Sequence, residues 1–356
     1  MGIRYDRDSR RATNGPMIFF SNLKDETFCE EIRSAFISGL SFYAYRMPGD
    51  LMLSFGSTEG YLEGIGEPGF VVGMFSPDKP FITIPYKKLK RGGEGGSYYM
   101  MPERSTTKEE YCSEVEKIKE AIGGDLDKKI VAARVVVEYS QIDLGEKFYE
   151  LCERFPNAYV FCFSTPATGC WIGASPELLL QNREGLLETM ALAGTRRADI
   201  YAGNWDEKNI KEQKIVAEYI EEVFRKHGLA AVAGETFTKK AGPVEHICTP
   251  ITALSPAGFG PEELLRDLSP TPALCGEPKD FALGEIINLE RFDRGCYGGF
   301  CGPYHSERDF TLNVVIRCGA VTPRHICKYA GGGITAQSDA EAEWIETELK
   351  LKSLAF

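Results

Sequence analysis

The hydrophobic and polar positions follow two periods, which together predict strands and helices in mixed order. Short apolar and β-branched runs such as residues 130–139 and 159–164 are typical of strands. Over residues 207–226 the apolar side chains instead form one helical stripe, and Gly228 follows as an end signal. A last helix is expected from Ser338, where the sequence S-D-A-E is a capping box.

The order of these elements indicates the fold class. Strands and helices do not alternate regularly, which favours an α+β fold with large antiparallel sheets over a doubly wound parallel sheet. The glycine-rich stretch RGGEGGSYY, residues 91–99, is the strongest internal boundary. We expect residues 1–356 to form a single domain, with a motif-poor N-terminal portion at 1–100 and a motif-bearing portion at 101–356.

Composition and charge exclude several classes of protein. With 52 acidic and 41 basic residues, the net charge of -11 disfavours a nucleic-acid partner, whose phosphates need cations. No run of about 18 apolar residues occurs, so we expect no membrane span. The 11 cysteines include no C-x-x-C pair and indicate free, mostly buried thiols in a reducing cytoplasm.

Three familiar motifs are absent or misplaced. Residues 64–69, GIGEPG, match a dinucleotide-binding pattern, but a strand-like run rather than a helix follows them, so we interpret them as a glycine-rich turn. The four histidines lack metal-ligand spacing. Ser175 lacks the G-x-S-x-G context of an esterase nucleophile.

Two predicted helices carry carboxylates that suit a cation. Glu343, Glu346 and Lys350 are spaced so that they share one face of the last helix. Glu212 borders the apolar stripe of the helix at 207–226. Each set can equally be a solvated surface. If both helices faced one cleft, their oxygens would suit Mg²⁺.

Lys129 and Glu177 are candidates for proton transfer. Lys129 begins a strand and falls on its more apolar face, where lost hydration favours the neutral amine of a general base. An edge lysine that reaches solvent is the alternative. Glu177 follows Pro176 and precedes three leucines, so its carboxyl is expected to keep its proton, unless it is a surface or capping residue.

Two further segments could bind an anion. Arg317 lies within an expected strand at 311–318, where it is either an outward residue or a bidentate partner for a carboxylate. The segment YAGGGITAQS, residues 329–338, follows an expected strand at 325–329. Its three glycines permit close approach of backbone N–H groups to an anion.

The order and spacing of these features resemble those of the chorismate-utilising enzymes, which include the isochorismate, salicylate and anthranilate synthases. The resemblance runs from Lys129 to the C-terminus. It rests on the segments KIVAAR, WIGASPELLL, LAGTRR, EHICTPI, SPTPALCGEPK, RFDRGCYGGFCG, VVIRCGA and AGGGITAQSDAEAEWIETELK. It implies an α+β fold of two large antiparallel sheets packed together, with helices outside.

Within that family, the residue types imply water as the nucleophile. Ammonia-using members carry Gln where this chain has Lys129, and aminodeoxychorismate synthases carry a nucleophilic Lys where it has Ala193. The run at 270–273, PTPA, is similar to that of isochorismate synthases. The resemblance therefore implies an isochorismate synthase, with salicylate synthase as the alternative. A binding protein that lost the chemistry is a third hypothesis, motivated by Asn209, which stands where relatives usually place an acidic residue.

The resemblance also implies a role for each candidate residue. Lys129 would activate water for attack at C2 of chorismate, and Glu177 would protonate the departing C4 hydroxyl. Mg²⁺ would be held by Glu212, Glu343 and Glu346. Substrate would be bound by Gly194, Thr195, His246, Arg317, Gly331, Gly332, Gly333 and Lys350.

The expected partner is thus the small molecule chorismate, with neither nucleic acid nor membrane involved. We expect a cytoplasmic monomer that needs no glutaminase subunit. The product could feed menaquinone or siderophore biosynthesis, and the sequence does not distinguish these pathways.

Overall fold

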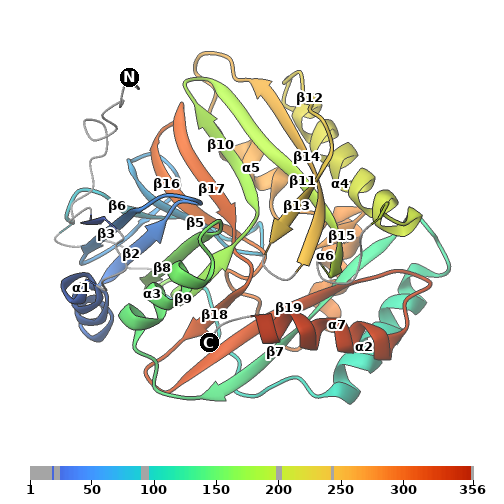
Figure 1. The fold of residues 1–356 in the computed structure, drawn as a ribbon, viewed down its shortest axis with the longest axis horizontal. Helices are drawn as coiled ribbons and strands as arrows, with labels where there is room; N and C mark the ends of the chain where they lie inside the picture. Colours follow the sequence, from blue (N-terminus) through green and yellow to red (C-terminus); the bar gives the residue numbers. More distant parts are fainter. Residues whose placement is uncertain (1–17, 20–24, 90–95, 198–202, 242–243, 354–356) are drawn as a thin grey trace.

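The computed structural model describes residues 18–19, 25–89, 96–197, 203–241 and 244–353, and they form two large antiparallel sheets (Figure 1). The expected boundary at 91–99 lies partly outside this range. The first sheet contains, in spatial order, β1 (Ile18–Phe19), β3 (Met52–Thr58), β2 (Ser41–Arg46), β8 (Tyr159–Thr165), β9 (Gly169–Ser175), β18 (Cys318–Val321), β19 (His325–Ile334), β7 (Lys129–Tyr139) and β15 (Gly276–Glu277).

The second sheet has ten strands. In spatial order they are β12 (Val232–Ala233), β14 (Val244–Leu254), β11 (Leu186–Arg197), β10 (Leu178–Arg183), β17 (Asp309–Val314), β16 (Phe300–Ser306), β5 (Gly69–Gly73), β6 (Ile82–Pro85) and β4 (Leu62–Glu63), while β13 (Phe237–Ala241) also pairs with β14. The N-terminal portion therefore contributes strands to both sheets.

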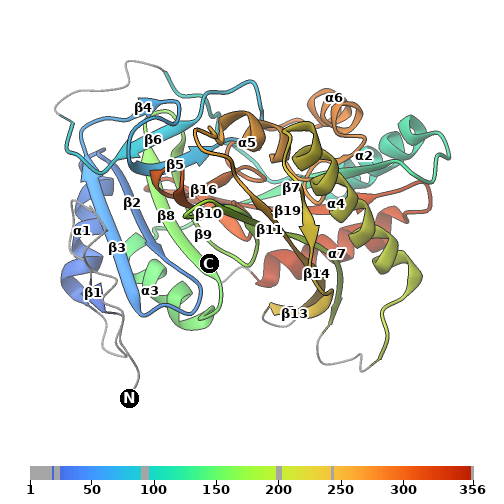
Figure 2. The same ribbon diagram turned by 90° about the horizontal axis from the view of Figure 1, so that it is seen from above.

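Seven helices of the described chain lie around the sheets (Figure 2). They are α1 (Glu26–Ile37), α2 (Lys108–Ile122), α3 (Leu144–Arg154), α4 (Glu207–Lys226), α5 (Glu262–Leu268), α6 (Lys279–Leu289) and α7 (Ala340–Ser353). Helices α2 and α7 contact β7 and β19, whereas α4 contacts β11 and β14. Among the described residues, no helix has the length and apolar character needed to span a membrane.

The main core forms where the two sheets face each other. Tyr43 of β2 stacks on Phe70 of β5, with ring centroids 5.3 Å apart, and Phe70 also meets Phe163 of β8. Alternating inward side chains of two stacked sheets produce such a core. All 11 cysteines are free and ten of them are buried, as the sequence predicts. The α+β prediction with two antiparallel sheets is confirmed.

Three local predictions need correction. The run at 311–318 is not one strand, because β17 ends at Val314 in the second sheet and β18 begins at Cys318 in the first. The glycines expected beyond a strand at 325–329 lie inside β19, which continues to Ile334. The last helix starts after Asp339, whose carboxylate accepts from the Ala342 N–H at 2.9 Å, so the helix is capped one residue later than expected.

Candidate active site

Lys129 is turned away from solvent at the start of β7. Its side chain is only 8% exposed, which confirms the burial expected from the strand pattern. The ammonium forms an ion pair with Glu212 of α4. A Cβ at Gly333 of the neighbouring strand β19 would collide with the Lys129 side chain. Glycine at position 333 therefore makes room for the buried lysine.

The three glycines of β19 border different groups because neighbouring strand residues face opposite sides of a sheet. Gly331 and Gly333 face the side of Tyr297 and Lys129, whereas a Cβ at Gly332 would lie 2.9 Å from the carboxylate of Glu343. These glycines pair with residues 131–133 of β7. They therefore belong to a regular ladder rather than to a loop folded around an anion.

Helix α7 places three predicted residues beside this ladder. Lys350 Nζ donates to the Gly331 carbonyl at 2.7 Å and forms an ion pair with Glu346 at 2.8 Å. Glu343 is 7% exposed and accepts from Ser338 Oγ at 2.8 Å. Arg134 anchors the helix to β7 through a 2.7 Å hydrogen bond from its Nε to Thr347. The anchor explains why a helix far along the chain lies against the strand of Lys129.

The predicted Mg²⁺ ligands fit that ion by their chemistry. Carboxylate oxygens suit Mg²⁺, which commonly uses one or two carboxylates together with substrate and water. Glu343 and Glu346 lie one turn apart on α7, and Glu212 comes from α4. However, within the described ranges no group of three His, Cys, Asp or Glu side chains is arranged to hold a metal. The metal assignment therefore stays a prediction.

Glu177 occupies the short link between β9 and β10. It is 5% exposed, and its backbone N–H donates to Ser175 Oγ at 3.2 Å. Burial raises the pKa of its carboxyl to about 7, while the positive charges of Lys239 and Arg317 lower that pKa. Near neutral pH the carboxyl therefore exchanges a proton readily, as expected for a general acid.

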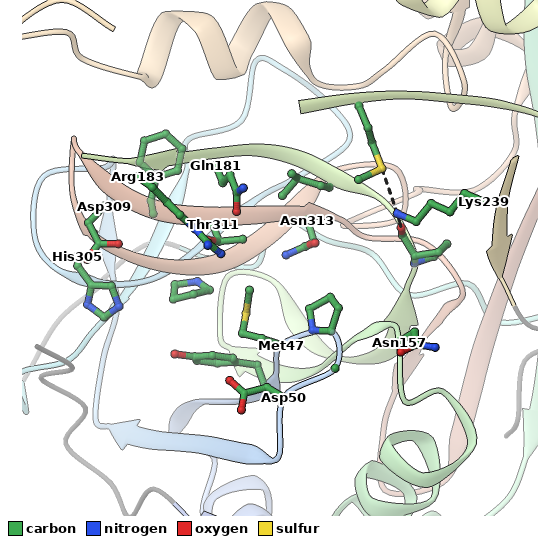
Figure 3. A pocket seen from close by; sticks show the side chains of 18 residues that line it. Met47, Asp50, Asn157, Gln181, Arg183, Lys239, His305, Asp309, Thr311 and Asn313 are labelled. Atoms are coloured by element: carbon green, nitrogen blue, oxygen red, sulfur yellow. Dashed lines mark hydrogen bonds between the residues drawn. The ribbon is translucent and has the colours of Figure 1, made fainter. Parts of the chain in front are cut away.

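Sequence reasoning missed Lys239 of β13. Its Nζ donates to the Pro176 carbonyl at 2.9 Å and lies 3.3 Å from Met190 Sδ (Figure 3). Burial lowers the pKa of this lysine, and the charge of Glu177 partly offsets that effect. The one available signal was strand alternation, which puts Lys239 on the same face as Phe237.

Arg317 lies where the chain crosses from one sheet to the other. It has a φ of 48°, a left-handed conformation that is uncommon for a residue with a side chain. Its carbonyl accepts from the Ala174 N–H at 3.1 Å, which fixes the crossing against the end of β9. Burial lowers the pKa of its guanidinium, and Glu177 opposes that shift. A strand periodicity cannot predict this conformation.

His246 lies on β14, opposite Thr195 of β11. Its Nδ1 donates to the Gly194 carbonyl at 3.0 Å. Burial lowers the pKa of His246 to about 4, and the positive charges of Arg317, Lys350 and Lys239 contribute to that shift. The imidazole is therefore neutral near pH 7. The side chain of Thr195 lies outside the described part of the structure.

Gly194 connects this strand pair to α4. It has a φ of 69° at an irregularity in the β11–β14 ladder. A Cβ there would lie 3.1 Å from Asn209, one turn before Glu212 on the same helix. Asn209 itself donates its side-chain amide to Asp206 at 2.9 Å. The unusual asparagine thus takes part in the cap of α4.

These contacts bring the predicted residues into one connected region. Lys129 contacts Glu212 of α4, and Gly194 lies against Asn209 of the same helix. His246 in turn donates to the Gly194 carbonyl. The electrostatic influence of Arg317 on both His246 and Glu177 links these residues to the acid. In a protein with a net charge of -11, this gathering of cations favours an anionic ligand.

Two cavities lie outside the set of predicted site residues. One of about 630 Å³ is bordered by Lys239 and by Pro176 and Leu178, the neighbours of Glu177 (Figure 3). Another of about 820 Å³ lies between residues 100–117 and 289–293. The predicted site residues line neither cavity.

Comparison with solved structures gives the fold class. The structure of MenF, described as the menaquinone-specific isochorismate synthase from Escherichia coli, superposes with a TM-score of 0.72 at 19% sequence identity. The match covers 88% of this chain and 87% of that one. The two-sheet architecture is therefore shared with MenF.

The chain belongs to the chorismate-binding enzyme family, because residues 91–355 match that family's model. Isochorismate synthase EntC of Escherichia coli K12 is 31% identical over 238 residues, which are 64% of this chain and 61% of EntC. Isochorismate synthase MenF of Haemophilus influenzae is 30% identical over 241 residues, which are 65% of this chain and 56% of that protein. The chain thus spans less than two thirds of these curated relatives.

Proposed function

We propose that this protein is an isochorismate synthase, which converts chorismate to isochorismate by Mg²⁺-dependent addition of water at C2 and loss of the C4 hydroxyl. The observation that carries the proposal is a lysine shielded from water together with a buried carboxyl whose pKa is about 7. The sequence similarity to two isochorismate synthases supports it.

Lys129 is the proposed base. It removes a proton from a water molecule as the oxygen of that water bonds to C2 of the ring. Both double bonds of the conjugated ring then shift by one position, and the C4–O bond breaks. Lys129 packs against Gly333 and has little access to solvent. This position supports the role, because few bulk water molecules can hydrogen-bond to the amine in place of the reacting water.

Glu177 is the proposed acid. It gives its proton to the departing C4 hydroxyl, which leaves as water. One water molecule is therefore consumed and one released, and the two side chains return to their starting states by proton exchange with solvent. A pKa near neutrality suits a group that must both hold and release this proton.

The remaining residues would bind the two carboxylates of chorismate. Arg317 and Lys350 supply positive charge, and His246 stays neutral beside them. In this proposal Glu212, Glu343 and Glu346 hold Mg²⁺, which when bound offsets the charge of the ring carboxylate. Glu212 forms an ion pair with Lys129, and Glu346 forms one with Lys350.

The test is product analysis. The protein is incubated with chorismate and Mg²⁺, and the products are separated and identified. We expect isochorismate, with no requirement for ammonia or a second subunit. Salicylate together with pyruvate would instead indicate salicylate synthase, and tight chorismate binding without any product would indicate a binding protein. The absence of isochorismate with any divalent metal would overturn the proposal.

A further inference from the structure

Lys239 of β13 reaches the residue directly before Glu177, at the end of β9. The Lys239 ammonium donates to the carbonyl of Pro176, 63 positions earlier in the chain and directly before Glu177. This contact holds the short link that carries the acid. Figure 3 shows the lysine extending along the cavity wall to reach that carbonyl.

The charged groups that influence Glu177 come from two elements. Lys239 approaches from β13, and Arg317 approaches from the crossing between β17 and β18. Lys239 is in turn influenced by Glu177 and by Cys248 of β14, while His246 of the same strand is neutral near pH 7. Of the two cations, Lys239 has the larger effect on the pKa of Glu177.

We propose that Lys239 is a positioning residue for Glu177: its ammonium fixes the Pro176 carbonyl, and with it the short link that carries the acid, and brings a positive charge to this link. This inference rests on the proposed function for its catalytic meaning, although the hydrogen bond from Lys239 to the Pro176 carbonyl stands on geometry alone. A fully buried carboxyl without a neighbouring cation would bind its proton more tightly and donate it more slowly.

The variants distinguish loss of the Lys239 charge and hydrogen bond from a general loss of folding. Lys239→Met keeps most of the length of the side chain but removes its charge and its donor. Lys239→Arg retains both. Lys240→Met is the matched control, because it removes the same charge from the exposed neighbour on the same strand. Lys239→Gln is a smaller, polar alternative should the methionine variant fail to fold.

The first measurement is the titration of Glu177 itself, by NMR of protein labelled with ¹³C at the glutamate carboxyls and assigned with Glu177→Gln. We expect the midpoint to move upward by about one pH unit in Lys239→Met. It should stay at the wild-type value in Lys239→Arg and in Lys240→Met. An unchanged midpoint in both Lys239→Met and Lys239→Gln would overturn the proposal.

The second measurement is the pH dependence of kcat with chorismate. We expect the alkaline limb in Lys239→Met to move to higher pH, as the titration midpoint does, with kcat lowered and KM little changed. Wild-type kcat and pH dependence in Lys239→Arg would show that the charge and the hydrogen bond matter, rather than the packing of the lysine side chain. If the wild type turned over no chorismate but the titration still shifted, the proposed function would fail while the link between Lys239 and Glu177 would stand.

Discussion

Lys129 at the start of β7 forms an ion pair with Glu212 of α4, and the two residues are 83 positions apart. The pair connects a strand of the first sheet with a helix that packs on the second. It therefore holds the proposed base where the two halves of the fold meet. The Lys129 side chain is buried, whereas that of Glu212 is 31% exposed, so loss of Glu212 would leave the lysine charge buried without this partner.

The role of Lys129 can be tested by Lys129→Ala. We expect kcat to fall by about 10² to 10⁴-fold, because proton removal from water is lost, while chorismate still binds. Steady-state kinetics and calorimetric titration with chorismate measure the two effects. Lys128→Ala, at the half-exposed neighbouring residue, should retain activity. Full activity in Lys129→Ala would remove the general-base assignment.

Glu177 predicts the pH dependence of activity. The acid must be protonated to donate, and its pKa is about 7, so kcat should decline above that pH. Glu177→Gln should lose about 10² to 10⁴-fold in kcat and show no such decline in its residual activity. A wild-type profile that rises steadily to pH 9 would contradict the assignment.

Glu177 also predicts a pH dependence of stability. Its pKa of about 7 in the folded protein exceeds the ordinary 4.5, so the folded state binds the proton more tightly. The stabilising contribution is complete below pH 4.5 and is lost as the pH rises through 7. Its size corresponds to about 3 kcal/mol. Urea unfolding at pH 5 and pH 8 should show a smaller loss for Glu177→Gln than for the wild type.

Gly333 should tolerate no side chain. In Gly333→Ala the new Cβ would collide with Lys129, so we expect the lysine to be displaced and kcat to fall. Gly284→Ala is a suitable control, because its Cβ would meet open space on α6. Circular dichroism checks folding in both variants. Wild-type kcat in Gly333→Ala would show that the placement of Lys129 against β19 is unimportant.

Metal dependence follows from the carboxylates of α7. We expect EDTA to abolish turnover and Mg²⁺ to restore it. Glu343→Gln should raise the Mg²⁺ concentration needed for half-maximal activity by at least about tenfold. Glu341→Gln, at an exposed residue of the same helix that pairs with Lys108, should leave it unchanged. Undiminished activity in EDTA would argue against the metal site.

The sequence predicted features that depend on local periodicity. The apolar stripe of α4 and the β-branched run of β7 specify their elements because each buries one continuous face. The pattern at 64–69 does precede strand β5 rather than a helix, as its following residues indicated. Glu177 was also a candidate from the sequence, because a proline and three leucines surround it, and the fold buries its carboxyl.

Other features depend on contacts between distant segments. The run at 311–318, TLNVVIRC, carries polar residues both inside β17 and at the crossing, so no break in polarity marks the change of sheet. Lys239 lies in a short outer strand, and only the fold shows that Pro176 is its partner. Gly332 and Gly333 of β19 must lack a side chain because Glu343 and Lys129 occupy the adjacent space. These neighbours are distant in the sequence, so no local pattern predicts this need for glycine.

The crossing at residues 315–317 restricts where this fold can change length. Only three residues join β17 to β18, and Arg317 is one of them. An inserted residue there would rotate the guanidinium away from Glu177 and displace the pairing of β18 with β9. Homologues should therefore vary in length around the outer hairpins, while this joint keeps a constant number of residues.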